Sequence, residues 1–343
     1  MSNIEQENVL EKPFTKSQNQ MKKVVFHQFG KPYDILAVEE VATPVPNADE
    51  VLIKVIASPI NPSDIMFVQN LYGIRPHLPS GAGFEGVGIV ESVGENVKIP
   101  IGTRVSFTGI GTWAAYVITN HRTLIPVPEA MPDDVAAQLF VNPFTAVAMV
   151  EESGVKSGEW LMITAAASAL GKMVIQICKM RGIKTIGTVR HNDHTEDLKS
   201  LGVDEVVNTS EENLPKKVQH ITKYEGVKAV LECVGGHTAS EAVKCMSRGG
   251  LMLIYGSLSL QDPQVNVGLM IFKELTLRGF WLTDWMRRVD TNTRQRVSQE
   301  VINLLVTGQV QIPIEAVYGL DEIKKAVSHA EASGRWGKVL LKP

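Results

Sequence analysis

Small side chains lie between two apolar segments near the middle of the chain, in a pattern that suits nucleotide binding. Residues 160–164 have the composition of a short buried strand, and residues 165–171 contain only Ala, Ser, Leu and Gly. A helical segment over 172–181 then leads to a second apolar strand over 184–189. This is the order of a βαβ unit, where a dinucleotide pyrophosphate needs close backbone approach and the N–H groups of a helix start. We therefore predict a dinucleotide site. Because Gly171 is the only glycine of the turn, plain close packing of helix on strand is the alternative.

The residue after the second strand bears on which dinucleotide is bound. An acidic residue there would bind the ribose 2′-hydroxyl of NADH, whereas an arginine suits the 2′-phosphate of NADPH. The chain has Arg190, followed by His191 and Asn192, and Asp193 is still close enough to reach a ribose. The pattern favours NADPH and leaves the strictness of that preference open.

Two kinds of strand pattern predict the elements that position this site. The fold class expected is α/β, with a β domain beside a doubly wound parallel sheet of the Rossmann type. The expected parts are an extension over 1–20, a β domain over 21–140, a cofactor domain over 141–305 and a return to the β domain over 306–343. Strand-like segments are expected at 23–26, 51–57, 86–93, 105–108, 114–119, 161–164, 185–189, 205–208, 229–232, 251–255 and 276–282. The apolar segment 338–341 is expected to pair with the first domain, which makes that domain discontinuous.

Composition excludes several classes of protein. A length of 343 residues is most natural for two domains, and a net charge of −3 without a long basic run gives no support to nucleic-acid binding. The apolar windows 135–150 and 160–178 are interrupted by polar residues, so neither predicts a membrane span. The three cysteines form no CxxC pair, which indicates a reducing compartment. The acidic first residues argue against an organellar transit peptide, so we expect a cytoplasmic location.

Several short stretches, in this order along the chain, resemble the medium-chain dehydrogenase/reductase superfamily. They are residues 61–64, 69–72, 111–113, 141–146, 233–236 and 277–282. The resemblance covers the chain from Met21 onward and is greatest to the 2-enoyl-thioester reductases of the zinc-independent branch, with quinone oxidoreductases as the nearest rival. It implies a GroES-like β domain, a Rossmann domain and a homodimer.

Zinc is the first question that the resemblance raises. Zinc-dependent members have an early Cys, a Gly-His-Glu segment and a lobe with four Cys, whereas this chain has Asn61, Phe84 before Glu85, and no such lobe. A catalytic zinc needs three converging nitrogen, sulfur or oxygen ligands. We therefore predict that no metal is bound. Without a Lewis acid, the hydride acceptor must already be polarised, as in a C=C conjugated to a carbonyl or in a quinone.

Tyr72 matches the catalytic tyrosine of the enoyl-thioester reductases. Hydride addition at the β carbon of an enoyl thioester produces an enolate, which then needs a proton at its α carbon. An unperturbed phenol has a pKa of about 10, so it is protonated at neutral pH and can donate. A tyrosine that merely packs in a Pro-rich loop is the alternative.

The resemblance also implies the remaining contacts. The cofactor is expected to contact Asn142, Thr145, Ala167, Ser168, Ala169, Leu170, Arg190, His191, Asn192, Tyr255, Gly256, Ser257, Leu258, Phe280, Trp281, Leu282 and Lys338. Among these, Asn142 and Thr145 are placed near the nicotinamide, and Lys338 near the phosphates. The substrate pocket is expected to include Asn61, Trp113, Phe280 and Trp281.

The function expected from these observations is NADPH-dependent hydride transfer to a conjugated C=C, with an enoyl thioester as the acceptor. An NADPH:quinone oxidoreductase or enone reductase is one alternative. A nucleotide-binding sensor with little catalysis is another. The acyl-chain length, and the choice between CoA and acyl carrier protein, stay open.

Overall fold

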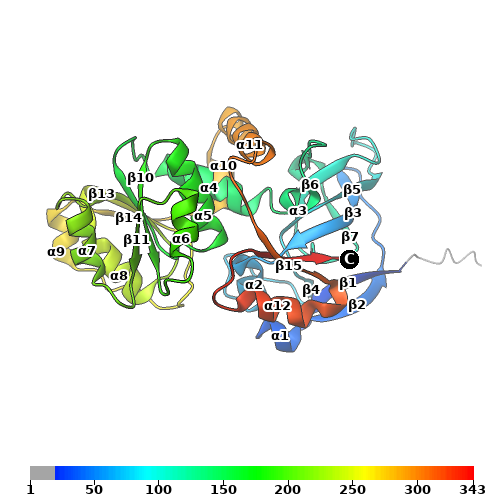
Figure 1. The fold of residues 1–343 in the computed structure, drawn as a ribbon. Coiled ribbons are helices and arrows are strands. Elements are labelled where there is room, and N and C mark those ends of the chain that lie inside the picture. Colours follow the sequence, from blue (N-terminus) through cyan, green and yellow to red (C-terminus); the bar gives the residue numbers. More distant parts are fainter. Residues whose placement is uncertain (1–19) are drawn as a thin grey trace, which may run out of the picture.

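The computed structural model describes residues 20–343, and Figure 1 shows them as two lobes. The extension expected over residues 1–20 lies outside the described residues, apart from Gln20, which begins the first strand. Between these lobes the chain passes along α4 and returns after α11.

The first domain is built mainly of strands. Its strands are β1 (Gln20–Phe26), β2 (Ala37–Ala42), β3 (Glu50–Pro59), β4 (Ser80–Gly81), β5 (Glu85–Val93), β6 (Arg104–Thr108), β7 (Tyr116–Asn120), β8 (Ile125–Pro126), β15 (Ile314–Gly319) and β16 (Lys338–Lys342). Its helices are α1 (Pro32–Ile35), α2 (Pro62–Val68), α3 (Asp133–Ala136) and α12 (Ile323–Glu331), with 3₁₀ turns η1 (His121–Thr123) and η2 (Leu320–Glu322).

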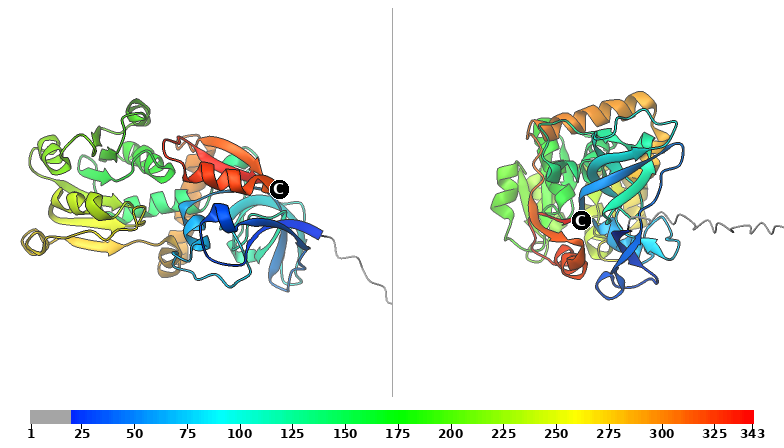
Figure 2. Two further views of the ribbon diagram at one scale, coloured as in Figure 1. Left: turned by 90° about the horizontal axis from the view of Figure 1, so that it is seen from below. Right: turned by 90° about the vertical axis from the view of Figure 1, so that its right-hand side faces the viewer.

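Strand β3 is the centre of this domain. The main sheet has the order β15-β16-β3-β5-β6-β8, with β7 also paired to β3, and a smaller sheet has the order β2-β1-β4. The terminal strand β16 runs antiparallel to β3, with Leu341 opposite Ser58. The C-terminal segment therefore completes the first domain, and Figure 2 shows it (red) beside the N-terminal strands (blue).

The second domain alternates strands and helices. Its strands are β9 (Trp160–Ile163), β10 (Lys184–Val189), β11 (Glu205–Asn208), β12 (Val227–Glu232), β13 (Met246–Ile254) and β14 (Thr276–Gly279). Its helices are α4 (Val141–Glu152), α5 (Ala169–Met180), α6 (Thr195–Leu201), α7 (Leu214–Ile221), α8 (Gly236–Lys244), α9 (Val267–Phe272), α10 (Leu282–Arg288) and α11 (Thr291–Val306).

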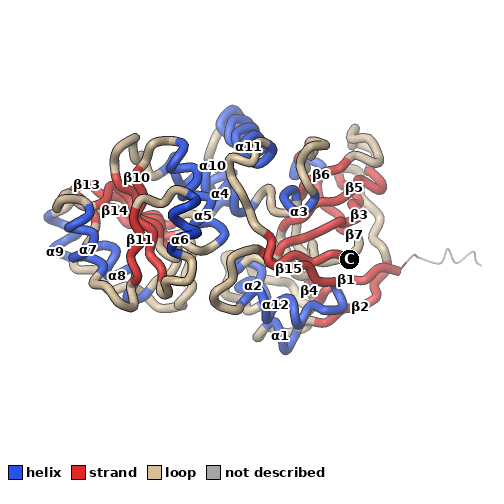
Figure 3. The backbone as a smooth tube through the Cα atoms, viewed as in Figure 1, coloured by secondary structure: helices blue, strands red, loops and turns tan. Residues whose placement is uncertain are grey.

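The sheet of the second domain has the order β11-β10-β9-β12-β13-β14, and all its pairings are parallel. Figure 3 shows helices on both sides of these strands. This is the doubly wound arrangement of a dinucleotide-binding domain, so the predicted fold class is confirmed. The strand order reverses between β9 and β12, and such a switch point opens a crevice at the carboxyl ends of the strands.

The structure corrects two details of the predicted elements. The strand expected over 276–282 ends at Gly279, because Trp281 caps a new helix that starts at Leu282. The segment after Val310 was expected to be β in character, but it contains α12 between its two strands. Helix α12 buries Ile323, Ala326 and Val327, which is the i, i+3, i+4 spacing of an amphipathic helix.

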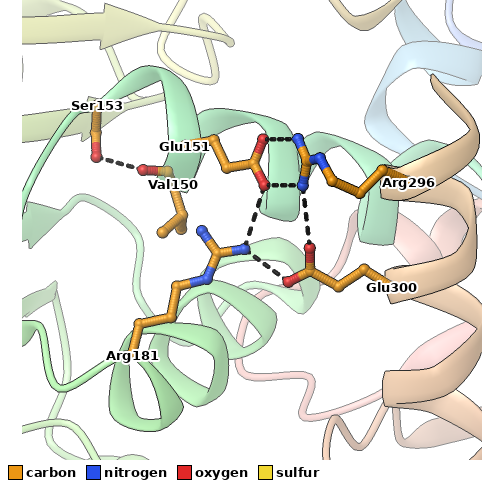
Figure 4. Close-up of polar contacts among 6 residues, drawn as sticks. All are labelled: Val150, Glu151, Ser153, Arg181, Arg296 and Glu300. Carbon is orange, nitrogen blue, oxygen red and sulfur yellow. Dashed lines mark hydrogen bonds and ion pairs between the residues drawn. The ribbon is translucent and has the colours of Figure 1, made fainter. Parts of the chain in front are cut away.

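Polar contacts join α11 to the ends of α4 and α5 (Figure 4). Both terminal nitrogens of Arg296 donate to the Glu151 carboxylate, at 2.7 and 2.8 Å. Arg181 donates to Glu300 at 2.6 Å and lies 3.6 Å from Glu151. The four side chains come from the carboxyl ends of α4 and α5 and from α11, and they are partly exposed, so salt should weaken them.

The largest apolar cluster crosses the junction of the two domains. It joins Ala57 and Val87 of the first domain to Phe144 of α4 and to the core of the second. Helix α4 is buried from Asn142 to Val150. No helix within residues 20–343 combines the length and apolar character that a bilayer crossing needs.

Candidate active site and cofactor pocket

A cavity of about 330 Å³ lies at the carboxyl ends of the parallel strands, at the switch point of the sheet. The loops that follow β9, β10, β11, β12 and β13 all contribute to it, together with the loop before β16. Its walls are Ala165, Ala167, Ser168, Thr188, Val189, Arg190, His191, Asp193, His194, Thr209, Val234, Thr238, Leu258, Ser259, Ala332, Ser333, Gly334 and Arg335. The size and position suit a nucleotide.

The small-residue turn at the start of α5 has a geometry that requires small side chains. Ala165 has a left-handed backbone (φ 48°), and Ser168 caps α5 by accepting a hydrogen bond from the Gly171 N–H at 3.0 Å. A Cβ on Gly171 would lie 2.6 Å from the carbonyl oxygen of Ala166, so this glycine allows the helix to press against the turn. Ala167 and Ser168 line the cavity, whereas the predicted contacts Ala169 and Leu170 belong to the first turn of α5 and do not.

The residues after β10 divide into two groups. Arg190 and His191 line the cavity, as does Asp193. Within residues 20–343 no carboxylate lies within ion-pairing distance of Arg190, which leaves its guanidinium available for an anion. Asn192 points elsewhere, because its amide donates to Glu211 at 3.1 Å and its oxygen accepts from the side chain of Asn208 at 3.1 Å.

A second arginine reaches the cavity from the other domain. Arg335 lies in the loop between α12 and β16 and is half-buried. Its Nε donates to the Ala332 carbonyl at 3.1 Å and its Nη1 to the Gly337 carbonyl at 3.2 Å. Burial lowers the pKa of its guanidinium. Arg335 was not predicted from the sequence, where the only local signal is the Gly334-Arg335 pair ahead of the terminal strand.

Tyr72 and Trp281 meet across the two domains. Tyr72 lies in the loop after α2, and Trp281 is the N-cap residue of α10. The indole Nε1–H of Trp281 donates to the Tyr72 hydroxyl oxygen at 2.8 Å, and the rings are edge-to-face with centroids 5.9 Å apart. Burial raises the pKa of Tyr72 above its usual value of 10, so the phenol carries its proton at neutral pH. This proton is free to point away from Trp281.

A buried polar cluster lies at the domain junction, around Asn61. The Asn61 oxygen accepts from the Lys338 ammonium at 2.6 Å and from the Asn142 amide at 3.3 Å, and its own amide donates to Glu85 at 2.8 Å. The other Glu85 oxygen accepts the backbone N–H of Val141 at 2.9 Å. The cluster therefore ties α2, β5 and β16 of the first domain to the start of α4.

Comparisons with known proteins agree with this geometry. Residues 47–129 match the family described as alcohol dehydrogenase GroES-like domain, and residues 169–306 match the one described as zinc-binding dehydrogenase. The mitochondrial enoyl-[acyl-carrier-protein] reductase of Caenorhabditis elegans is 36% identical over 84% of this chain and 86% of its own. The chain belongs to the medium-chain dehydrogenase/reductase superfamily. The resemblance predicted from the sequence is thus confirmed.

Two further members of the superfamily are similar over almost their whole length. The human mitochondrial enoyl-[acyl-carrier-protein] reductase is 32% identical over 90% of this chain and 84% of its own. The crystal structure of Escherichia coli quinone oxidoreductase complexed with NADPH has a TM-score of 0.87 and 28% identity, and the match covers 94% of this chain and 100% of that one.

In the present chain, the residues around Asn61 do not suit a zinc ion. The Asn61 oxygen is occupied by an ammonium, Glu85 is occupied by N–H donors, and Phe84 offers no ligand atom. No group of three or more His, Cys, Asp or Glu side chains in the described chain is placed to hold a metal. A zinc would have to displace Lys338 and would still lack the soft or imidazole ligands that it prefers.

The positive charge in the cluster around Asn61 is the ammonium of Lys338. Burial raises the pKa of Asp64 to about 8, so this neighbouring carboxyl is protonated at neutral pH. Burial also raises the pKa of Glu85, against the hydrogen bonds that its carboxyl accepts from Val141 and Asn61. Burial lowers the pKa of Lys338 to about 8, so it still carries a charge at neutral pH. The Asn61 side chain thus bridges the buried Lys338 ammonium and the buried Glu85 carboxyl.

The structure places several predicted contacts outside the cavity. Lys338 was expected near the phosphates, but its ammonium bonds to Asn61. Trp113 was expected on a pocket wall, but it is 0% exposed in the core of the first domain, where its Nε1 donates to the Pro59 carbonyl at 3.1 Å. Its complete burial leaves no face for a substrate.

The remaining predicted contacts lie near the junction without lining the cavity. The Thr145 hydroxyl donates to the Val141 carbonyl within α4. Phe280 and Leu282 are buried in the large apolar cluster. Tyr255, Gly256 and Ser257 follow β13, and of this segment only Leu258 reaches the cavity.

Proposed function

We propose that the chain is an NADPH-dependent reductase of the C=C bond of an enoyl thioester. The observation that carries this proposal is the protonated Tyr72 hydroxyl, held by Trp281 at 2.8 Å at the junction of the two domains. A proton donor fixed in this way serves an acceptor that must be protonated on carbon. The names of the relatives that are more than 30% identical support the same substrate class.

The chemistry divides between cofactor and protein. NADPH, when bound, supplies a hydride to the β carbon of the enoyl thioester. The π electrons then move to the carbonyl oxygen, and the α carbon of the enolate takes a proton. Tyr72 holds that proton at its hydroxyl, and Trp281 fixes the oxygen so that the hydroxyl hydrogen points away from the indole. The negative charge left on Tyr72 is stabilised by the same indole N–H until solvent returns a proton.

Arg190 and Arg335 are proposed to bind the 2′-phosphate. Each lines the cavity with a cationic side chain, and a charge-assisted hydrogen bond contributes about 1.5–3 kcal/mol. We predict that Arg190→Ala raises the NADPH Michaelis constant by roughly one to two orders of magnitude and leaves NADH use nearly unchanged. Arg335→Ala should act in the same direction. Equal losses for both cofactors would show that the arginines are structural.

A side-by-side assay tests the proposed function. NADPH oxidation is followed with a crotonyl thioester and with a 1,4-quinone, and we expect the thioester to be the better acceptor. Quinone-only turnover would favour the second candidate, an NADPH:quinone oxidoreductase, which is the activity in the name of the Escherichia coli structural neighbour. NADPH binding without turnover on either acceptor would favour a sensor.

We propose that the reaction needs no metal, because the residues around Asn61 do not fit a zinc ion. The purified protein should contain well under one zinc per chain, and a chelator should leave its activity unchanged. Elemental analysis that finds stoichiometric zinc would overturn this interpretation of Asn61 and Phe84.

A homodimer is proposed to form through the outer edge of the second domain. Strand β14 ends the sheet, and nearby α9 exposes Val267, Ile271 and Phe272 to 68, 62 and 79%. Unpaired sheet edges and exposed apolar side chains of this kind are usually covered. Sedimentation should show a dimer at micromolar concentration, and a monomer would argue against this interface.

We propose a location for the protein from the state of its cysteines. Cys178, Cys233 and Cys245 are buried and unpaired, which suits a reducing compartment such as the cytoplasm.

A further inference from the structure

The loop between α12 and β16 (residues 332–337) belongs to the first domain but is held by contacts with side chains of the second domain. The Trp336 ring in this loop has the Lys172 ammonium 3.9 Å from its centroid. The His194 imidazole lies nearby as well, with the two ring centroids 4.9 Å apart. Lys172 is in the first turns of α5, and His194 is the N-cap residue of α6, so both belong to the cofactor domain. Figure 2 shows the dark red loop reaching the green helices of that domain.

Further hydrogen bonds fix the backbone of the same loop. His194 Nε2 bonds to the Gly334 carbonyl at 3.0 Å, and the Lys172 ammonium donates to the Trp336 carbonyl. From the other side, Glu315 of β15 accepts the N–H of Trp336 at 3.2 Å and that of Gly337 at 3.0 Å. These anchors flank Arg335 in the sequence, so they determine where its guanidinium lies.

Lys172 occupies an unusual environment for a lysine. It is 2% exposed, and no carboxylate within residues 20–343 forms an ion pair with it. Its ammonium is instead satisfied by the Trp336 ring face and carbonyl, an arrangement that is favourable when the cation is desolvated. The lysine and the tryptophan therefore depend on each other across the two domains.

We propose that Lys172, Trp336 and His194 form a clamp that positions Arg335 over the cofactor cavity and thereby sets the preference for a 2′-phosphate. This inference rests on the proposed NADPH function. Because the clamp holds a first-domain loop against the second domain, recognition of the 2′-phosphate is coupled to the junction between the domains. The three side chains are positioning residues, and Arg335 makes the contact.

Binding measurements on clamp variants test the proposal. By calorimetry, Trp336→Leu and Lys172→Met should each raise the Kd for NADPH by roughly 10- to 150-fold, since a misplaced Arg335 loses about one charge-assisted hydrogen bond. The Kd for NADH should change by less than about twofold on the same reasoning, because NADH lacks the phosphate. Lys172→Arg keeps a cation over the ring and should bind both cofactors normally.

The chain offers a matched control. Lys184 lies 5.4 Å from the ring centroid of Trp160, in a second lysine–tryptophan pair of the same domain, and neither residue lines the cavity. Lys184→Met should leave both dissociation constants unchanged. If it raises the Kd for NADPH as much as Lys172→Met does, the effect of Lys172 is not specific to the clamp, and the proposal fails.

A double-mutant comparison separates positioning from direct contact. In an Arg335→Ala background, Trp336→Leu should cause no further change in the ratio of the two dissociation constants. Additive losses would overturn the proposal, and so would an equal rise of both constants in the single variants. If the wild-type protein shows no preference for NADPH, the proposed function fails. If it prefers NADPH and Trp336→Leu keeps that preference, only the clamp fails.

Discussion

Tyr72→Phe should lower turnover on an enoyl thioester by about 10²–10⁴, the usual contribution of a general acid. The substitution keeps the ring, which packs against Phe84 at 5.2 Å and against Trp281 at 5.9 Å, and deletes only the hydroxyl. Folding and NADPH binding should therefore survive. Turnover with saturating NADPH and crotonyl thioester, beside the dissociation constant for NADPH, measures both expectations.

Quinone reduction is the control for this variant. A quinone takes its protons from solvent after the hydride arrives, so its reduction should be affected far less by the loss of the Tyr72 hydroxyl. Near-normal thioester turnover by Tyr72→Phe would remove the tyrosine from the mechanism and favour the quinone reductase interpretation.

Lys338→Met should destabilise the fold by about 1–3 kcal/mol, the usual cost of leaving a buried hydrogen-bond acceptor without its donor. Lys338 is 5% exposed, and its loss would leave the Asn61 oxygen without its closest donor and remove the positive charge that favours the ionised form of Glu85. Urea unfolding at neutral pH, where the Lys338 ammonium is charged, measures the loss.

A second substitution tests the cause of that loss. In Lys338→Met/Glu85→Gln neither side chain can carry a charge, so part of the stability should return. The return is incomplete because the glutamine NH₂ group would face the N–H groups of Phe140 and Val141. A Lys338→Met variant as stable as the wild type would contradict this role of Lys338. A double variant no more stable than Lys338→Met would show that hydrogen bonding and packing, and not charge, explain the effect.

Local sequence patterns were sufficient for the cofactor domain. The strands from β9 to β13 lie where apolar segments alternate with helices, because each buries a continuous apolar run between two layers. Arg190 lines the cavity because it directly follows β10, and Ala167 and Ser168 do so because they lie in the short turn between β9 and α5.

Contacts between segments far apart in the chain could not be predicted from local sequence patterns. Arg335 comes to the cavity only because β16 pairs with β3 and its preceding loop is held by Trp336. The same pairing brings Lys338 to Asn61 instead of to the phosphates. An aromatic residue such as Trp113 has the same sequence signature in a core as on a pocket wall, so only the fold could place it.

The most direct test of the central claim is the reduction of a crotonyl thioester by unlabelled NADPH in D₂O, with the product analysed by NMR. Hydride transfer to the β carbon followed by protonation from Tyr72, which exchanges with solvent, predicts a butyryl thioester with one deuterium at the α carbon and none at the β carbon. Failure to form the saturated thioester, or deuterium at the β carbon, would contradict the account.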